Sequence, residues 1–234
     1  MKFFYKTLLV AVAAIVSSCT TDAEDESDSF DAAKVCPESG RGTFTDDRDG
    51  QVYKYTTIGN QVWMAENLKY DAEYSLCLDS AEDTRDSWHV VWINDFCDIF
   101  GRFYSLQKDG SYSEERDDAF VKNVCPAGWH LPSVDEWMRL ADVAGLKNLE
   151  NASTRLKNPE YWNFYKTGTD VCDFSANPAG AYMGEKLGLT YFESEAIFGT
   201  STVDESGKIQ SIKIAKDVTV FNNLPKMSIR CVKE

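Results

Sequence analysis

The sequence has few histidines and few basic residues for its length, and both shortages exclude classes of function. Its 234 residues include two histidines, so a zinc site built from three histidine ligands is excluded. They include 24 basic against 38 acidic residues, which gives a formal net charge of −14. Because nucleic-acid binding needs clustered cations that displace counterions from phosphates, we expect no nucleic-acid partner.

The sequence also lacks the motifs of several kinds of enzyme and metal site. It contains no Cys-X-X-Cys pair, no His-Glu-X-X-His and no Gly-X-Ser-X-Gly. Paired carboxylates are too numerous in so acidic a chain to indicate a glycosidase. His130 lies just before an expected helix, where a structural hydrogen bond is the simpler role than catalysis. We therefore expect a protein that is not an enzyme, with no cofactor and no metal.

Long apolar runs are rare, and the longest lies at the N-terminus. Lys2 and Lys6 precede nine apolar residues, Leu8–Val16, and two small serines follow. Nine residues are too few to cross a bilayer core of roughly 30 Å as a helix. The segment is typical of a secretory signal peptide, so we expect residues 1–18 to be removed on export.

The next residues predict a lipid anchor. Residues 16–19, Val-Ser-Ser-Cys, resemble the lipobox of bacterial lipoproteins, in which the signal peptidase cleaves before the cysteine and that cysteine is acylated. Two or three acyl chains anchor a protein stably, because each buried CH₂ group contributes about 0.8 kcal/mol. We predict that Cys19 is the lipid anchor and that the membrane is a partner through it.

An acidic segment follows the predicted anchor. Thr20–Lys34 carries six acidic residues, one basic residue and one large apolar residue, Phe30. Such a segment cannot bury enough surface to fold, so residues 19–34 are expected to form the lipidated cysteine and a disordered linker. Acidic residues after the cysteine also resemble the signal that sends some lipoproteins to the outer face of the outer membrane; the alternative is a plain solvated spacer. The expected location is the bacterial cell envelope, at the outer membrane.

Beyond the linker, short strands and turns predominate. Gln51–Ile58 and Gln61–Met64 read as strands, and the Gly59-Asn60 pair between them is a two-residue hairpin signal. The acidic loop Asp46–Gly50 could be read as a calcium loop, but it fits the EF-hand ligand pattern poorly and we prefer a plain turn. Alternation near the C-terminus places Met227, Ile229 and Cys231 on one face of a strand.

One helix has a clear start. Ser133 and Glu136 form a capping box, in which each side chain satisfies an amide that the first helical turn leaves free. Four apolar residues recur at helical spacing and predict an inward face; Gly145 is placed to end the helix. The apolar residues are Val134, Trp137, Met138 and Ala141.

Several blocks of the sequence resemble the Fibrobacter succinogenes major paralogous domain, a family of exported bacterial lipoproteins. The blocks occur in the family's order from about Gly42 to the C-terminus, and residues 35–234 are therefore expected to form one such domain. The matching blocks are residues 46–53, 58–68, 101–104, 125–132, 174–180 and 229–232.

The family is distantly similar to the formylglycine-generating enzyme and to C-type lectin-like domains. This similarity implies an α+β fold with two helices, small antiparallel sheets and long loops. Gly101–Gln107 would enter the first helix, and Ser133–Ala144 would form the second. The enzyme's pair of copper-binding cysteines has no counterpart here, because no cysteine lies between Cys172 and Cys231. Its activity is therefore not implied.

Six cysteines remain beside Cys19, an even number that favours disulfides in an exported protein. Their spacing alone does not choose among the possible pairings. The family resemblance implies Cys125–Cys231 and Cys77–Cys97. It leaves Cys36 with Cys172, although the second of these positions is not a characteristic cysteine of the family.

Two tryptophans are candidates for ligand binding. Trp88 and Trp92 lie between Cys77 and Cys97, outside the matching blocks, among acidic residues. Exposed rings there could stack on sugars while carboxylates bind the hydroxyls; the alternative is that they cover the core. We expect a non-catalytic recognition or adhesion module for glycan or protein ligands, with a structural component of the cell surface as the alternative.

Overall fold

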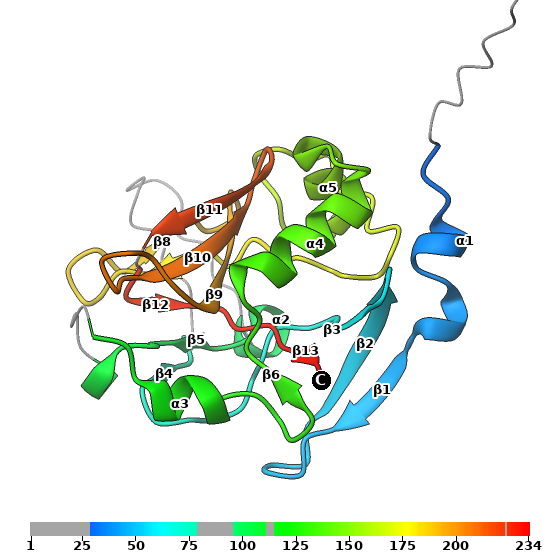
Figure 1. The fold of residues 1–234 in the computed structure, drawn as a ribbon. Helices are drawn as coiled ribbons and strands as arrows, with labels where there is room; N and C mark the ends of the chain where they lie inside the picture. Colours follow the sequence, from blue (N-terminus) through cyan, green and yellow to red (C-terminus); the bar gives the residue numbers. More distant parts are fainter. Residues whose placement is uncertain (1–28, 79–95, 111–114, 223) are drawn as a thin grey trace, which may run out of the picture.

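The computed structural model describes residues 29–78, 96–110, 115–222 and 224–234 (Figure 1). Within these ranges the chain is a mixture of short helices and of strands that form three antiparallel sheets. The α+β class expected from the sequence is therefore confirmed. None of the described helices has the length and apolar character that crossing a membrane requires.

The first sheet contains the predicted hairpin and the C-terminal strand. The two strands of this hairpin are antiparallel: Tyr55 pairs with Met64 at one end, and Ile58 pairs with Gln61 beside the turn. Gly59 adopts φ 61° in the turn. The C-terminal strand lies between strands Gln61–Met64 and Trp129–His130, so the two ends of the domain are joined in one sheet. In spatial order the strands are β1 (Gly42–Thr45), β2 (Val52–Ile58), β3 (Gln61–Met64), β13 (Val232–Lys233) and β6 (Trp129–His130).

Both faces of this sheet are covered, which explains why its burial pattern is not a simple alternation. Tyr53 lies in one cluster of buried side chains, where its ring stacks on Phe44. Ile58 and Trp63 lie in a second cluster, where Trp63 contacts the ring of Trp137 with 4.7 Å between centroids. The hairpin thus lies between two clusters of buried side chains and contributes residues to both.

The other two sheets come from the middle and the end of the chain (Figure 1). One is a meander of β9 (Ala196–Val203), β10 (Ile209–Ile214) and β11 (Val218–Asn222). The other has the spatial order β4 (Ser75–Leu76), β5 (Phe103–Tyr104), β12 (Lys226–Met227), β7 (Ala181–Tyr182) and β8 (Leu189–Thr190).

The predicted helix is present as α4 (Val134–Gly145), and both hydrogen bonds of its capping box form. Trp137 is 1% exposed, as its place on the apolar face predicted. The α5 helix (Leu149–Leu156), which the sequence analysis did not predict, starts at the N-cap residue Asn148. Its Asn, Ser and Thr residues are weak helix formers, so packing against α4 stabilises it. The remaining helical turns are α1 (Ala32–Val35), η1 (Glu38–Gly40), α2 (Phe96–Phe100), η2 (Lys108–Gly110) and α3 (Asp118–Asn123).

The helix expected at Gly101–Gln107 is wrong. The α2 helix ends just before this segment, which instead contributes β5 to the third sheet. Tyr104 there pairs with both Ser75 and Met227. Residues 103–107 are all buried, and a short run buried on every side suits a central strand rather than an amphipathic helix.

The expected boundary between linker and domain at residue 35 is too late. Asp31 caps the α1 turn by accepting a hydrogen bond from the Ala33 amide. Phe30 packs against the core, and the guanidinium of Arg155 lies 4.0 Å from the centre of its ring. The folded part therefore includes the last residues of the acidic segment.

Three disulfides join distant parts of the fold. They link Cys36 to Cys172, Cys77 to Cys97 and Cys125 to Cys231, with Cα–Cα distances of 5.4, 5.7 and 6.0 Å. These are the three pairs that the sequence analysis expected. The first and third close chain separations of 136 and 106 residues, so they connect the N-terminal and C-terminal halves of the domain.

Gly145 sets the close approach of α4 and α5. A Cβ atom on this residue would lie 2.9 Å from both Cβ and N of Ala152. Real Cβ atoms do not come so near to backbone, so any side chain there would push the two helices apart. The left-handed residues Leu146 and Lys147, at φ 51° and 63°, then turn the chain into α5.

We predict that Gly145→Ala lowers the free energy of unfolding by about 1–3 kcal/mol, the usual range for overpacking a core. Helix propensity alone predicts the opposite sign, because alanine is favoured over glycine by about 1 kcal/mol. Urea unfolding of the purified domain measures the difference. Asp142→Ala, at an exposed site on the same helix, is the control and should change stability by less than about 0.5 kcal/mol. A more stable Gly145→Ala protein would refute the packing argument.

Candidate functional site

A long loop, residues 158–175, leaves the end of α5 and returns to the same place. Its base is closed by a parallel bridge between Lys157 and Ala176. The Asn158 amide donates to the Ala176 carbonyl at 3.1 Å, and the Ala176 amide donates to Leu156 at 2.9 Å. Long loops whose ends meet are frequently functional in compact domains. We call this segment the long loop.

Backbone strain is concentrated in the long loop. Of the ten described non-glycine residues with positive φ, five lie in it. Each such residue costs on the order of 1–3 kcal/mol and persists only where its surroundings fix it, a combination that clusters at binding and catalytic sites. The five are Tyr161, Tyr165, Asp170, Asp173 and Ser175, with φ between 46° and 65°.

The first half of the long loop is fixed by a buried lysine. The Lys157 ammonium donates to the carbonyls of Tyr165 and Ala215 at 2.7 and 3.0 Å, and it lies 4.8 Å from the centre of the Trp162 ring. Burial lowers the pKa of Lys157 to about 8. The indole N–H of Trp162 donates to the Ala176 carbonyl at 3.3 Å. Lys157 and Trp162 thus hold the loop from the inside.

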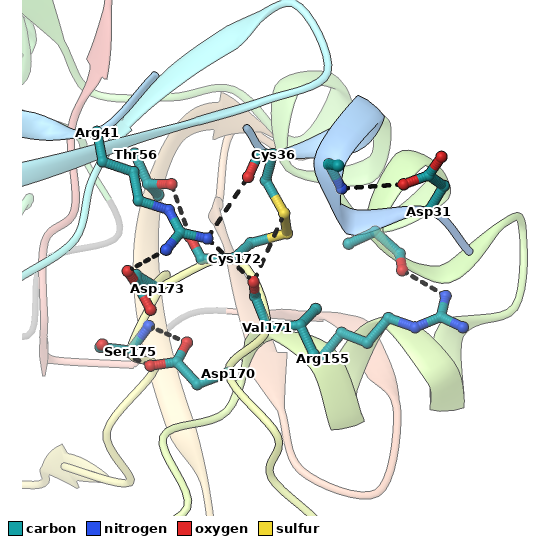
Figure 2. Close-up of a disulfide and its surroundings, with 12 residues drawn as sticks. Asp31, Cys36, Arg41, Thr56, Arg155, Asp170, Val171, Cys172, Asp173 and Ser175 are labelled. Carbon is teal, nitrogen blue, oxygen red and sulfur yellow. Dashed lines mark hydrogen bonds and ion pairs between the residues drawn. A yellow bond between two sulfur atoms is a disulfide. The ribbon is translucent and has the colours of Figure 1, made fainter. Parts of the chain in front are cut away.

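The second half is fixed by a disulfide and by hydrogen bonds (Figure 2). The Cys172 sulfur is bonded to Cys36, and the Cys172 carbonyl accepts a hydrogen bond from the Thr56 hydroxyl at 2.6 Å. The Asp170 carboxylate accepts from the amide and the hydroxyl of Ser175, both at 2.7 Å. Burial raises the pKa of Asp170, and the bonds from Ser175 oppose that rise.

The long loop presents aromatic rings to solvent. Phe164 is 62% exposed, Tyr165 50% and Tyr161 39%, and these make up half of the large apolar side chains exposed in the described ranges. The amide of Asn163, between them, donates to the Glu193 carbonyl at 2.9 Å, and its side chain is bonded to the Glu193 carboxylate. Rings next to hydrogen-bonding groups, on a backbone that is already fixed, form a surface suited to recognition.

A polar cleft of about 340 Å³ lies where the end of the long loop faces the first sheet. The sheet supplies Lys54 and Tyr55, and the loop supplies Asp173 and Ser175. Arg41 crosses between them, since one of its guanidinium nitrogens donates to Asp173 at 2.6 Å (Figure 2). The cleft is large enough to hold a ligand the size of one sugar residue.

Arg41 is held firmly in this cleft. Its second terminal nitrogen donates to the carbonyls of Val171 and Cys36, at 3.2 and 3.4 Å (Figure 2). Both acceptors adjoin or belong to the Cys36–Cys172 disulfide. The covalent bridge and the guanidinium therefore position the same part of the loop.

These features define a disulfide-linked α+β domain with a rigid, partly aromatic loop. The chain belongs to the family described as the Fibrobacter succinogenes major domain, whose model matches residues 56–233. Searches of curated proteins and of solved structures find no match. The matched segment includes the long loop, whereas Cys36, Arg41 and Lys54 lie before it.

Several residues singled out from the sequence lie outside the described ranges: the predicted lipid anchor Cys19 and the predicted ligand-binding residues Trp88 and Trp92. Within the described ranges, no group of three or more histidine, cysteine, aspartate or glutamate side chains is placed to hold a metal ion. The Asp46–Gly50 segment is a turn, in which the buried Asp46 carboxylate pairs with Arg48 at 2.7 Å.

His130 contacts the capping box of α4. Its Nε2 atom lies 2.8 Å from the Glu136 carboxylate, which also accepts from the Ser133 amide. Although burial alone would raise the pKa of Glu136, the hydrogen bonds from Ser133 and His130 lower it overall. Both side chains therefore stabilise the start of the helix, as the structural interpretation of His130 predicted.

Sequence reasoning missed the long loop, although one signal was visible. Residues 161–165 contain four aromatic residues in five positions. Whether these rings can form a binding surface depends on which of them are exposed. The buried contacts of Lys157 and Trp162 decide this, and they are not visible in the sequence. The cleft had no sequence signal, because Arg41 and Asp173 are 132 positions apart.

We predict that replacing Cys36 and Cys172 by serine lowers the free energy of unfolding by about 2–5 kcal/mol, the usual effect of removing a native disulfide. Amide exchange at residues 170–175 should also become faster, because the bridge pins this part of the long loop. Exchange measured by mass spectrometry tests this. The matched control, Cys77→Ser with Cys97→Ser, should leave exchange at 170–175 unchanged; equal effects of the two pairs would contradict the assignment.

We also predict that Lys157 makes stability depend on pH. Its pKa is about 8 when folded and about 10.4 when unfolded, so the unfolded chain binds more protons between these values. The contribution of Lys157 to stability should therefore rise as pH increases from about 8 to about 10. Urea unfolding of wild type and Lys157→Met across this range should give diverging curves. Parallel curves would show that the folded pKa is not lowered, and Lys122→Met, at an exposed site, supplies the reference.

Proposed function

We propose that this chain is an exported lipoprotein of the bacterial cell envelope, anchored at the outer membrane through Cys19. Its domain would act as a non-catalytic recognition or adhesion module for a glycan or protein ligand. The signal-like residues 1–18 and the cysteine that follows them support the anchoring. The acidic segment that begins at Thr20 supports a spacer that holds the domain off the membrane.

The exposed aromatic rings of the long loop carry the proposal for recognition. Ordering a loop on binding costs about 0.5–1.5 kcal/mol for each immobilised side chain, and a loop that is already fixed avoids much of this cost. Aromatic residues are also the ones most often found to dominate binding energy. The loop therefore combines the side chains and the rigidity that a binding surface needs.

The chemistry of the long loop favours a glycan as the ligand. The electron-rich faces of Phe164 and Tyr165 can pack against the C–H groups of a sugar ring. The paired side chains of Asn163 and Glu193 offer donors and acceptors of the kind that sugar hydroxyls require. A protein ligand would use the same rings without needing these polar groups beside them.

A structural role in surface assembly is the alternative, and the placement of exposed apolar residues disfavours it. An assembly surface would need a broad apolar patch. Outside the long loop, the large apolar residues exposed in the described ranges are Val52, Leu187 and Val220, which lie on β2, in the turn between β7 and β8, and on β11. Catalysis is the least supported role, since His130 and Glu136 already serve the helix cap.

We further propose that the domain has a C-type lectin-like arrangement related to the formylglycine-generating enzyme. Three features support this: a single long capped helix, a C-terminal strand within a small sheet, and extended loops joined by disulfides. In such a domain, variation in the loops would change the ligand while the sheets stay the same.

We predict that Phe164→Ala and Tyr165→Ala each weaken glycan binding at least tenfold. A truncated hot-spot side chain costs about 2 kcal/mol or more, and each 1.4 kcal/mol is a factor of ten. The protein lacking residues 1–19 would be applied to glycan and cell-surface arrays, and affinities for the glycans found would be measured by calorimetry. Stability should change by less than about 0.5 kcal/mol, because both rings are exposed.

Val220→Ala is the control, since it removes an exposed apolar side chain from β11. It should leave the affinity unchanged. A folded protein that binds nothing on either array would overturn the recognition function. A ligand whose affinity is the same for wild type and both aromatic variants would overturn the role of the long loop.

A further inference from the structure

More basic than acidic residues line the polar cleft beside the end of the long loop. Of its lining residues, Arg41 and Lys54 are basic and Asp173 is acidic. The chain as a whole carries 38 acidic and 24 basic residues. Two further carboxylates adjoin the lining and are already bonded: Glu66 pairs with Lys69, and Asp170 accepts hydrogen bonds from Ser175.

Lys54 supplies an ammonium that pairs with no carboxylate in the part of the chain that the structure describes. Among the described residues, no carboxylate lies within ion-pair distance of its side chain. The Glu66 carboxylate accepts from the backbone amide of Lys54 at 2.7 Å and from the Lys69 ammonium at 3.3 Å. Within the described ranges, the Lys54 side chain therefore lines the cleft without an ion-pair partner.

The rest of the cleft is already organised for a ligand. Arg41 is fixed by Asp173 and by two backbone carbonyls, and its Nε–H group is buried without an acceptor in the described structure. Tyr55 contributes an aromatic wall, which approaches the backbone closely because residue 42 is glycine; a Cβ there would lie 2.6 Å from the Tyr55 hydroxyl. The exposed Asp173 carboxylate adds an acceptor.

We propose that this cleft binds the carboxylate of an acidic sugar, so that the glycan recognised by the protein contains uronic acid residues. The carboxylate would lie between Lys54 and the guanidinium of Arg41, the sugar ring would pack against Tyr55, and Asp173 would accept from a hydroxyl. A neutral sugar would leave the Lys54 charge unused. This inference rests on the proposed recognition function, because the long loop supplies both the aromatic rings and one wall of the cleft.

The test compares an oligogalacturonate with its methyl ester, which has the same shape without the charge. Wild-type protein should bind the acid about tenfold more tightly than the ester, since a hydrogen bond between charged groups contributes about that factor. Lys54→Gln should lose this preference by weakening binding of the acid alone. Lys54→Arg should retain it, and Lys122→Gln, with the same change of charge on α3, should not alter it.

The outcomes separate this inference from the recognition function. Equal binding of acid and ester by wild type, or an unchanged preference in Lys54→Gln, would overturn the cleft assignment. If Phe164→Ala still weakened binding in that case, the recognition function would stand. Binding of an acidic peptide in place of the oligogalacturonate would overturn the assignment to a sugar. Absence of any glycan binding would overturn both proposals.

Discussion

Arg230 brings a guanidinium into the interior, with 0% of the residue exposed. A buried charge without partners costs several kcal/mol, so its neighbours must supply acceptors. They do so from two distant segments: the side-chain oxygen of Asn67 accepts two of its N–H groups, and the carbonyls of Phe174 and Ser175 accept others. Asn67 in turn donates to the Phe100 carbonyl at 2.8 Å. One side chain thus ties the C-terminal strand region to the hairpin, to α2 and to the long loop.

Burying Arg230 also helps to fix the end of the long loop. Phe174 directs its carbonyl and its ring toward Arg230, and the ring centre lies 4.5 Å from the guanidinium carbon. The residues on either side of it, Asp173 and Ser175, both adopt left-handed backbone conformations. Such conformations are costly by themselves, but an unsatisfied buried guanidinium would cost more. The hydrogen bonds to Arg230 therefore compensate for strain in this part of the loop and, with the disulfide, help to fix the wall of the cleft.

Features of the fold that depend on neighbouring residues could be predicted from the sequence. The Gly59-Asn60 turn and the capping box of Ser133 and Glu136 are examples, because a few adjacent side chains decide them. The segment at Gly101–Gln107 was mispredicted, since its place in a central strand depends on partners far along the chain. The family resemblance led to the disulfide pairs that spacing could not choose. The cleft could not be predicted at all, because Arg41, Lys54 and Asp173 meet only after the first sheet and the long loop have packed together.

The Cys36–Cys172 disulfide also determines how the proposed tether meets the proposed binding surface. The α1 turn ends at Val35, and the next residue is bonded covalently to the long loop. If a bound ligand pulled on the long loop, the disulfide would transmit the force to the segment before Cys36 and so to a tether that begins at Cys19. The hydrogen bonds of the sheets would not have to carry this force. The ion pair between Arg41 and Asp173 joins the same two segments. Since disulfides form and persist mainly in oxidising compartments, this connection between tether and loop suits the proposed export of the protein.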